Sequence, residues 1–173
     1  MASRWSLKDK RAVITGGTKG IGYGIAKTLL DAGMRVAVSG RNAEDAQKAA
    51  AGLSNDQSRV LGVGSDVRNL DSEKKAIAAV LDKFGQVDLV LANVGLGYFA
   101  PVDEMEPEQW LQMIDTNLTG AFYTLKASVE ALKKSKGYYM TLASLVGTNF
   151  FPTASGYNAS KFGVVGFTQA AML

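Results

Sequence analysis

The sequence predicts an α/β fold built on a doubly wound parallel sheet with helices on both faces. Short apolar runs of strand length alternate with longer segments of helical apolar spacing, which is the pattern of parallel strands joined by crossover helices. A glycine-rich turn joins the first apolar run to the first helical segment. The chain has 173 residues, of which 47% are hydrophobic, so a single domain over residues 1–173 can bury a core.

The first two strands are expected at residues 12–14 and 35–39, where apolar residues run together. The helix between them ends at Gly33, since glycine accepts the left-handed conformation that closes a helix. One face of this helix carries Ile21, Ile25 and Leu29. Together these elements form the first β-α-β unit of the predicted sheet.

The next two helices are recognised by their ends. Asn42 is the expected N-cap of a helix over residues 42–53, and Gly85 closes the helix that follows. The apolar face of that second helix is formed by Ile77, Val80, Leu81 and Phe84. Strands are expected on either side of it, at residues 59–63 and 87–92.

An irregular stretch then leads to a helix that opens near Glu108, and a longer helix follows it. The longer helix has an apolar face that we expect to be buried, formed by Leu118, Phe122, Leu125, Val129 and Leu132. A fifth strand at residues 138–142 and a last helix from about Tyr157 complete the predicted elements.

Composition excludes several classes of site. The chain has no cysteine and no histidine, so disulfides, thiolate or imidazole chemistry and nearly all zinc sites are excluded, and no metal is expected. The net charge of +3 is scattered, which gives no indication of nucleic-acid binding. No apolar run approaches the ~20 residues of a membrane span, and the N-terminus is too polar for a signal peptide, so we expect a cytoplasmic protein without membrane contact.

The stretch at residues 15–22, T-G-G-T-K-G-I-G, predicts an anion-binding turn. Glycine permits so tight a turn and lets a phosphate reach the backbone amides, while the helix N-terminus adds unpaired N–H groups and partial positive charge. A purely structural glycine turn is the alternative. The residues expected to contact the ligand are Gly16, Thr18, Lys19, Gly20, Ile21 and Gly22.

The remaining strand ends are expected to share in this site. In a doubly wound sheet the ligand lies beyond the carboxyl ends of the strands, at the point where the strand order reverses. Those ends fall at residues 39–41, 64–67, 92–95 and 143–147, and each contains a glycine. Glycine at these places suits a cofactor that lies across the edge of the sheet.

The second informative stretch is Y-N-A-S-K, from Tyr157 to Lys161. A separation of four residues places both side chains on one helix face. The neighbouring ammonium favours the phenolate, which makes the tyrosine proton exchangeable near neutral pH. Ser144, just after the fifth strand, is placed to offer a hydroxyl to the same substrate oxygen, although its position taken singly favours an ordinary strand-end hydroxyl.

Ser144, Tyr157 and Lys161, after the T-G-x-x-x-G-x-G turn, resemble the short-chain dehydrogenase/reductase family, and the resemblance spans the chain. It implies a Rossmann-like dinucleotide-binding and catalytic domain that transfers a hydride between a nicotinamide cofactor and a small-molecule carbonyl or alcohol. Tyr157 would be the general acid/base and Ser144 would hold the substrate oxygen. Lys161 would bind the nicotinamide ribose, which Tyr157 also contacts. Asn117 would complete the catalytic set by keeping a water that relays protons to Lys161.

The same resemblance implies further cofactor contacts. Asp66 and Val67 look like the family's adenine-contacting pair. After the fourth strand the family has N-N-A-G where this chain has A-N-V-G, so contact is implied for Asn93 and Gly95 with altered packing.

The choice of cofactor is argued from charge. The end of the second strand reads S-G-R-N, without the carboxylate that binds the ribose hydroxyls of NAD. Arg41 and Lys19 would instead bracket the 2′-phosphate of NADP, and the resemblance implies basic residues at both places. NADP(H) is therefore expected, the alternative being that both are solvated surface charges.

The chain ends at Leu173, inside what the resemblance implies is a long helix, so we expect it to lack the last strands of the family. The open sheet edge then predicts a partner copy, and hence a homo-oligomer, a dimer or tetramer. The implied substrate is a 3-oxoacyl thioester or a small ketone or aldehyde, and Phe99, Phe150 and Phe151 are equally consistent with a pocket wall and with core packing. A non-catalytic NADP-binding module, or an inactive fragment of a longer reductase, is the alternative function.

Overall fold

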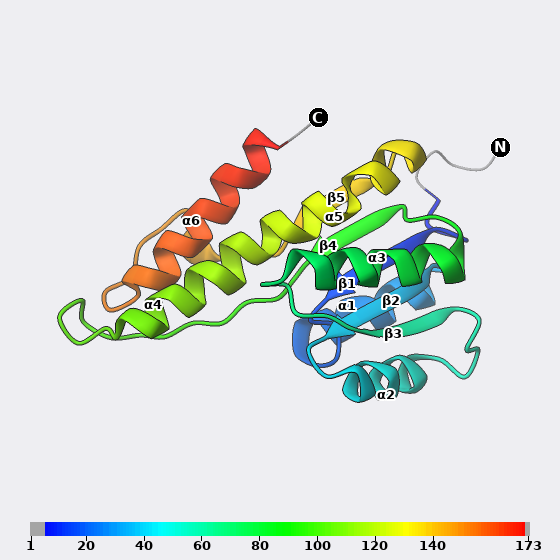
Figure 1. The fold of residues 1–173 in the computed structure, drawn as a ribbon, viewed down its shortest axis with the longest axis horizontal. Helices are drawn as coiled ribbons and strands as arrows, with labels where there is room; N and C mark the ends of the chain where they lie inside the picture. The colour runs from blue at the N-terminus through cyan, green and yellow to red at the C-terminus, as the bar shows by residue number, and fades with distance from the viewer. Residues whose placement is uncertain (1–5, 172–173) are drawn as a thin grey trace.

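The computed structural model describes residues 6–171 and confirms the doubly wound architecture. The described sheet has five parallel strands in the order β3-β2-β1-β4-β5 (Figure 1). The strands are β1 (Arg11–Thr15), β2 (Arg35–Gly40), β3 (Val60–Gly64), β4 (Leu89–Ala92) and β5 (Tyr138–Thr141).

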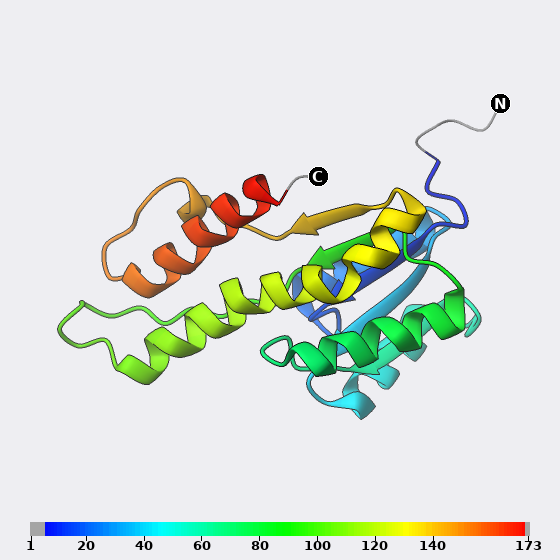
Figure 2. The same ribbon diagram turned by 45° about the horizontal axis from the view of Figure 1, so that its top comes forward.

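Helices cover both faces of this sheet. They are α1 (Gly20–Asp31), α2 (Ala43–Leu53), α3 (Leu70–Phe84), α4 (Pro107–Met113), α5 (Gly120–Ser135) and α6 (Ser155–Ala170). A π-helical turn, η1 (Ile114–Thr119), joins α4 to α5, so the three form one long rod. In Figures 1 and 2, α6 lies alongside the first half of this rod.

The core is divided by the sheet. Alternate residues of a strand point to opposite faces, so Ile14 packs in the cluster beneath α1 and α2 whereas Val13 packs beneath α3 and α5. A third cluster, beneath α6, is much smaller and has three buried members: Ala92, Ala121 and Val164. The last helix therefore rests on less buried apolar surface than the others.

The predicted helix ends are confirmed by their geometry. The Asn42 side chain accepts a hydrogen bond from the Glu44 N–H at 2.8 Å, which caps α2. Gly33 and Gly85 follow α1 and α3 with φ of 94° and 74°, the left-handed conformation expected there.

The predicted buried face of the long helix is wrong for most of its residues. The buried residues of α5 are Gly120, Ala121, Thr124, Ser128 and Leu132, of which the prediction included one. Phe122 is 42% exposed and packs edge-on against Phe167 of α6, with ring centroids 6.2 Å apart. Small side chains face the protein interior because the close approach of neighbouring elements leaves no room for large ones.

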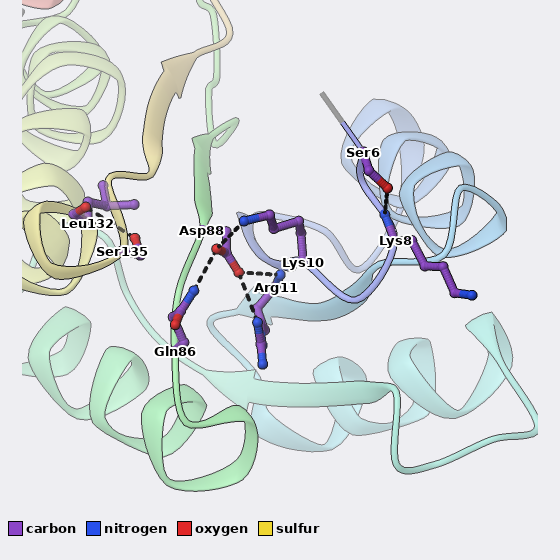
Figure 3. A network of polar contacts seen from close by, with 8 residues as sticks. All are labelled: Ser6, Lys8, Lys10, Arg11, Gln86, Asp88, Leu132 and Ser135. Carbon is purple, nitrogen blue, oxygen red and sulfur yellow. Dashed lines mark hydrogen bonds and ion pairs between the residues drawn. The ribbon is translucent and has the colours of Figure 1, made fainter. Parts of the chain in front are cut away.

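The buried residue Asp88 links strands at their N-terminal ends (Figure 3). Asp88 is 5% exposed and accepts hydrogen bonds from the Arg11 backbone N–H at 2.9 Å and the Gln86 side-chain amide at 2.7 Å. The Lys10 ammonium lies 3.4 Å from the same carboxylate. The Asp88 backbone also bonds to Arg11 and Tyr138, so this residue ties together the starts of β1, β4 and β5.

Candidate active site

A cleft of about 1,030 Å³ runs along the carboxyl ends of the strands. β1 and β4 are neighbours in the sheet although β2 and β3 separate them in sequence, so the strand order reverses between them and the cleft lies at this point. Ligand pockets typically measure about 300–1,000 Å³, so this cleft suits a ligand as large as a dinucleotide.

Most of the predicted site residues meet in this cleft. Its walls include Gly16, Thr18, Lys19, Ile21, Gly22, Arg41, Asp66, Val67, Asn93, Gly95, Ser144, Tyr157 and Lys161. Two predicted residues, Gly20 and Asn117, are not part of the walls. Ile21 is 65% exposed, because the buried face of α1 is turned by one position and consists of Gly22, Ala26 and Leu30.

The glycine turn has the geometry that an anion site requires. Gly16 and Gly20 have φ of 65° and 58°, which side chains disfavour. A Cβ on Gly22 would lie 2.6 Å from the Asn93 side-chain nitrogen, so only glycine fits there. Lys19 provides no side-chain cap for α1 and the first turn has no acidic residue, which leaves the helix N-terminus available to a phosphate.

Asn93 braces this turn. Its side-chain amide donates to the carbonyl oxygens of Thr15 at 2.9 Å and Gly16 at 3.2 Å, and its backbone N–H donates to the Thr15 hydroxyl at 3.1 Å. The end of β4 is thereby bonded to the end of β1. The prediction gave Asn93 a cofactor contact, and the structure adds that its amide fixes the shape of the turn.

Two basic residues of the cleft, Lys19 and Arg41, lie where the glycine turn after β1 packs on the end of β2. The Gly17 N–H donates to the Ser39 carbonyl at 3.1 Å, and a Cβ on Gly40 would lie 2.7 Å from Thr18, so the turn packs on the strand end. The residues that follow, Lys19 and Arg41, both line the cleft. Neither makes an ion pair within residues 6–171, which leaves both charges available to a ligand.

Asp66 is held by a neighbouring guanidinium. Arg68 donates to both oxygens of the Asp66 carboxylate, with the shortest contact at 2.6 Å. These bonds, with a smaller contribution from Arg41, hold the pKa of Asp66 below its usual value. The carboxylate therefore stays ionised beside the cleft and neutralises Arg68 rather than Arg41.

The catalytic candidates lie at the other end of the cleft. Tyr157 and Lys161 project from the first turns of α6, with the ammonium 5.9 Å from the centre of the phenol ring. Lys161 is 4% exposed and donates to the Leu142 carbonyl at 2.8 Å. Burial lowers the pKa of Lys161, because desolvation disfavours the ammonium. Ser144 begins the short turn η2 (Leu145–Gly147) and lines the same end.

Asn117 lies behind the wall, in the π-helical turn η1. Its amide accepts from the Leu96 N–H at 2.9 Å and donates to the Leu96 carbonyl at 2.8 Å and the Ser160 hydroxyl at 2.9 Å. A Cβ on Gly95 would lie 3.4 Å from the Lys161 nitrogen and 3.5 Å from the Asn117 side-chain oxygen. The side chain of Asn117 is therefore a brace between the segment after β4 and α6.

Two bracing residues were missed by the sequence-based prediction. Asn158 is buried, and its amide donates to the carbonyl oxygens of Val146 at 3.0 Å and Asn149 at 2.7 Å, which fixes the loop before α6. Glu73 is 2% exposed and accepts from the hydroxyls of Ser65 at 2.6 Å and Thr124 at 2.7 Å. In both cases the sequence shows only a polar residue within a predicted helix. That does not identify the groups to which its side chain bonds.

The aromatic residues near the catalytic end are not core residues. Phe99, Phe150 and Phe151 are 63%, 86% and 46% exposed, so the core-packing alternative is wrong. Phe99 lines the cleft, and its ring lies edge-on to Tyr157 at 5.7 Å. An apolar wall therefore stands directly beside the phenol.

Within residues 6–171, no group of three or more potential metal-ligating side chains is found. In the same part of the chain, no helix is both long enough and apolar enough to cross a membrane.

The chain is similar to known proteins over most of its length. A 3beta-hydroxysteroid dehydrogenase of Mediterraneibacter gnavus is 32% identical over 163 residues, which are 94% of this chain and 59% of that protein. The structure of an alcohol dehydrogenase from Thermococcus sibiricus, complexed with 5-hydroxy-NADP, matches with a TM-score of 0.89 and 35% identity, covering 94% of this chain and 70% of that one.

A third counterpart is the structure of a 3-ketoacyl-(acyl-carrier-protein) reductase from Brucella melitensis, complexed with NADH. Its TM-score is 0.89 at 28% identity, covering 95% of this chain and 69% of that one. The chain thus spans between 59% and 70% of the lengths of these three proteins. The family model for short chain dehydrogenases matches residues 10–173, and the chain belongs to this family of oxidoreductases.

Proposed function

We propose that this protein is an NADP(H)-dependent oxidoreductase that interconverts a carbonyl compound and the corresponding alcohol. The observation that carries the proposal is the placement of Ser144, Tyr157 and Lys161 at one end of the same cleft that holds the glycine turn at the other. The glycine turn fits a dinucleotide because its helix N-terminus is uncapped and only glycine fits at position 22. The nicotinamide, when bound, supplies or accepts the hydride.

The residues of the chain then have separate tasks. In the reducing direction the Tyr157 hydroxyl donates its proton to the carbonyl oxygen, and the Ser144 hydroxyl donates a hydrogen bond to that oxygen. Lys161 is held by the Leu142 carbonyl close to the phenol, where its ammonium can also meet a ribose hydroxyl. Asn117 acts as a positioning residue, because its side chain bonds to Leu96 and Ser160 instead of lining the cleft.

The preference for NADP(H) rests on Lys19 and Arg41. Both line the cleft, and neither is neutralised by an ion pair within residues 6–171. The charge of Arg41 acts on Asp66, but that carboxylate is already bonded to Arg68. A 2′-phosphate would therefore find two available cations, and each charge-assisted hydrogen bond is worth about 1.5–3 kcal/mol.

A titration of the 173-residue chain with NADPH and NADH tests the cofactor assignment. NADPH is expected to bind at least about 10-fold more tightly than NADH, and Arg41→Ala is expected to weaken NADPH about 10-fold or more while changing NADH less than about threefold. Equal affinity for the two nucleotides would refute the NADP assignment. Lys48→Ala, an exposed lysine on α2, is the matched control for loss of a positive charge.

The catalytic assignment is tested with Tyr157→Phe. We expect the Kd of NADPH to stay within about threefold, whereas kcat for ketone reduction falls by about 10³-fold or more because the proton donor is lost. A Tyr157→Phe variant with unchanged function would favour the non-catalytic NADP-binding module instead.

We also propose that the protein assembles with copies of itself. The edge strand β5 exposes Tyr138 and Met140, which are 60% and 53% accessible, and α5 exposes part of Phe122. Exposed apolar residues on an edge strand and a helix suit burial in an interface. Light scattering on the eluting peak of a gel-filtration column checks this proposal, and a monomer at micromolar concentration would contradict it.

A further inference from the structure

The catalytic end of the cleft differs in chemistry from the cofactor end. The cofactor end carries the basic residues Lys19, Arg41 and Arg68 together with the carboxylates of Asp45 and Asp66. At the catalytic end, apart from the proposed catalytic residues, the lining side chains are apolar or uncharged: Leu96, Phe99, Gln112, Thr116, Leu142 and Ala143. The cofactor end of the cleft is thus charged, whereas the catalytic end is mainly neutral and apolar.

Lys161 is the one cation that lines the catalytic end among residues 6–171, and its ammonium is already engaged. It is 4% exposed, donates to the Leu142 carbonyl at 2.8 Å and lies 5.9 Å from the Tyr157 ring. The loop that continues from Phe99 is acidic, with exposed carboxylates at Asp103, Glu104, Glu106 and Glu108. A carboxylate on a substrate would therefore meet no available cation at this end of the described cleft.

Two loops frame the apolar mouth, and polar contacts hold them together. In Figures 1 and 2 the loops that precede α4 and α6 lie at the same end of the molecule, and the Ala100 N–H donates to the Thr153 carbonyl at 2.8 Å. Asn158, next to Tyr157, also accepts from the Phe151 N–H at 3.3 Å. The 66%-exposed side chain of Leu145 belongs to the loop that Asn158 fixes.

We infer that the substrate is a neutral, largely apolar ketone or its alcohol, and that the catalytic end of the cleft selects against carbonyl compounds that carry a carboxylate. The inference rests on the proposed function and adds the substrate class to it. Its physical basis is the cost of removing a carboxylate from water without a cation to receive it. Of the substrate classes expected from the sequence, it favours the small ketone or aldehyde.

The size of the selection follows from that desolvation. A carboxylate in partial contact with Leu96 and Phe99 loses water on one side and gains no ion pair, which we expect to lower kcat/KM about 100-fold relative to an uncharged isostere. Gln112 adds no charge to this wall, and its amide oxygen already accepts a hydrogen bond from the Tyr98 hydroxyl at 2.9 Å.

The test compares 4-acetylbenzamide with 4-acetylbenzoate as substrates for NADPH-dependent reduction by the 173-residue chain. The two compounds share the ring and the ketone and differ by one negative charge. We expect kcat/KM to be about 100-fold higher for the amide, with acetophenone reduced as well as the amide or better. Phe99→Lys, which adds a cation to the wall, should narrow the ratio to about 10-fold or less, whereas Phe99→Leu, the neutral control, should keep it.

Equal kcat/KM for the two compounds, or a preference for the carboxylate, would overturn the inference while the proposed function stands. If the chain binds NADPH but reduces neither compound, ligand-observed NMR on the NADP⁺-loaded chain decides it: a Kd for the carboxylate at least about 10-fold weaker than for the amide supports the inference, and equal Kd values overturn it. A chain that binds no nucleotide refutes the proposed function, and the inference falls with it.

Discussion

Replacing Lys161 with methionine should make the protein more stable while it abolishes activity. Methionine has a similar unbranched shape, so the substitution removes the charge with little change of volume. The ammonium of Lys161 is 4% exposed and has one hydrogen-bond acceptor, the Leu142 carbonyl at 2.8 Å. No ion pair with this ammonium is found within residues 6–171, so the buried charge has a cost in stability.

The magnitude follows from opposing contributions. Removing a buried ammonium recovers a desolvation cost of several kcal/mol, for which about 5 is a central value. The lost hydrogen bond and the carbonyl left without its donor cost together about 3 kcal/mol, and the contact with the Tyr157 ring at 5.9 Å adds about 0.5 kcal/mol. We therefore expect Lys161→Met to raise the free energy of unfolding by about 1–2 kcal/mol at pH 6.

The gain in the free energy of unfolding from Lys161→Met should shrink as the pH rises. Burial lowers the pKa of Lys161 in the folded chain below the 10.5 of an ordinary lysine, which applies to the unfolded chain. Between these two pKa values the unfolded chain binds more protons than the folded chain, so the stability of the wild type increases with pH across this window. Below the window the full cost of the buried charge is present, and methionine removes it there.

Urea unfolding followed by circular dichroism at pH 6 and pH 9.5, without nucleotide, measures the difference. Lys48→Met is the matched control, because Lys48 is exposed on α2 and its loss should change the free energy of unfolding by less than about 0.5 kcal/mol. NADPH-dependent ketone reduction by Lys161→Met should fall about 100-fold or more. A Lys161→Met variant less stable than the wild type at pH 6, or an advantage that grows with pH, would refute the reasoning.

Three further substitutions test the polar braces of the structure. Asn158→Ala releases the loop before α6 and should raise KM for the ketone about 10-fold, with the Kd of NADPH within about twofold, in steady-state kinetics and nucleotide titration. Glu73→Leu removes the acceptor shared by the hydroxyls of Ser65 and Thr124, each of which keeps one other partner, and should lower the free energy of unfolding by about 1–3 kcal/mol in urea, whereas Glu73→Gln, which bonds to both, should lose less than about 1 kcal/mol. Asp88→Ala removes the acceptor shared by the Arg11 backbone N–H and the side chains of Gln86 and Lys10, and should cost about 3–5 kcal/mol, a fall of about 10 °C in Tm by calorimetry. An unchanged KM would contradict the role of Asn158. A Glu73→Gln variant as unstable as Glu73→Leu would contradict the role of Glu73, and a Tm shift under about 3 °C would contradict that of Asp88.

The sheet could be predicted from the sequence because its strands are buried on both faces. Continuous apolar runs such as the one at residues 36–38 have no amphipathic ambiguity, and Asn42, Gly33 and Gly85 mark the helix ends by local backbone chemistry. The buried face of α5 could not be predicted in the same way. Apolar spacing identified Phe122, but close packing of neighbouring elements selects small residues such as Ser128, and apolar spacing does not report that distance.

The candidate site, too, could be predicted from the sequence only in part. Tyr157 and Lys161 are four residues apart on one helix, so their spacing alone places them together. Asn158 and Glu73 bond to partners that the fold brings from other elements, and no local pattern indicates those partners. For Asn117 the motif identified the residue, yet only the hydrogen bonds to Leu96 and Ser160 reveal that its side chain braces the wall from behind.

The two ends of the cleft are held in place by different forces, and this difference fits their tasks. The glycine turn, the proposed phosphate site, sits on β1 and α1, which contribute Ile14 and Leu30 to the large apolar cluster, so we expect it to be ordered before any ligand binds. The catalytic end rests on the small cluster around Val164 and on side-chain amides that hold loops at a few points. A dinucleotide spanning both ends would therefore gain its affinity at the rigid end and order the loops at the other, where the substrate enters.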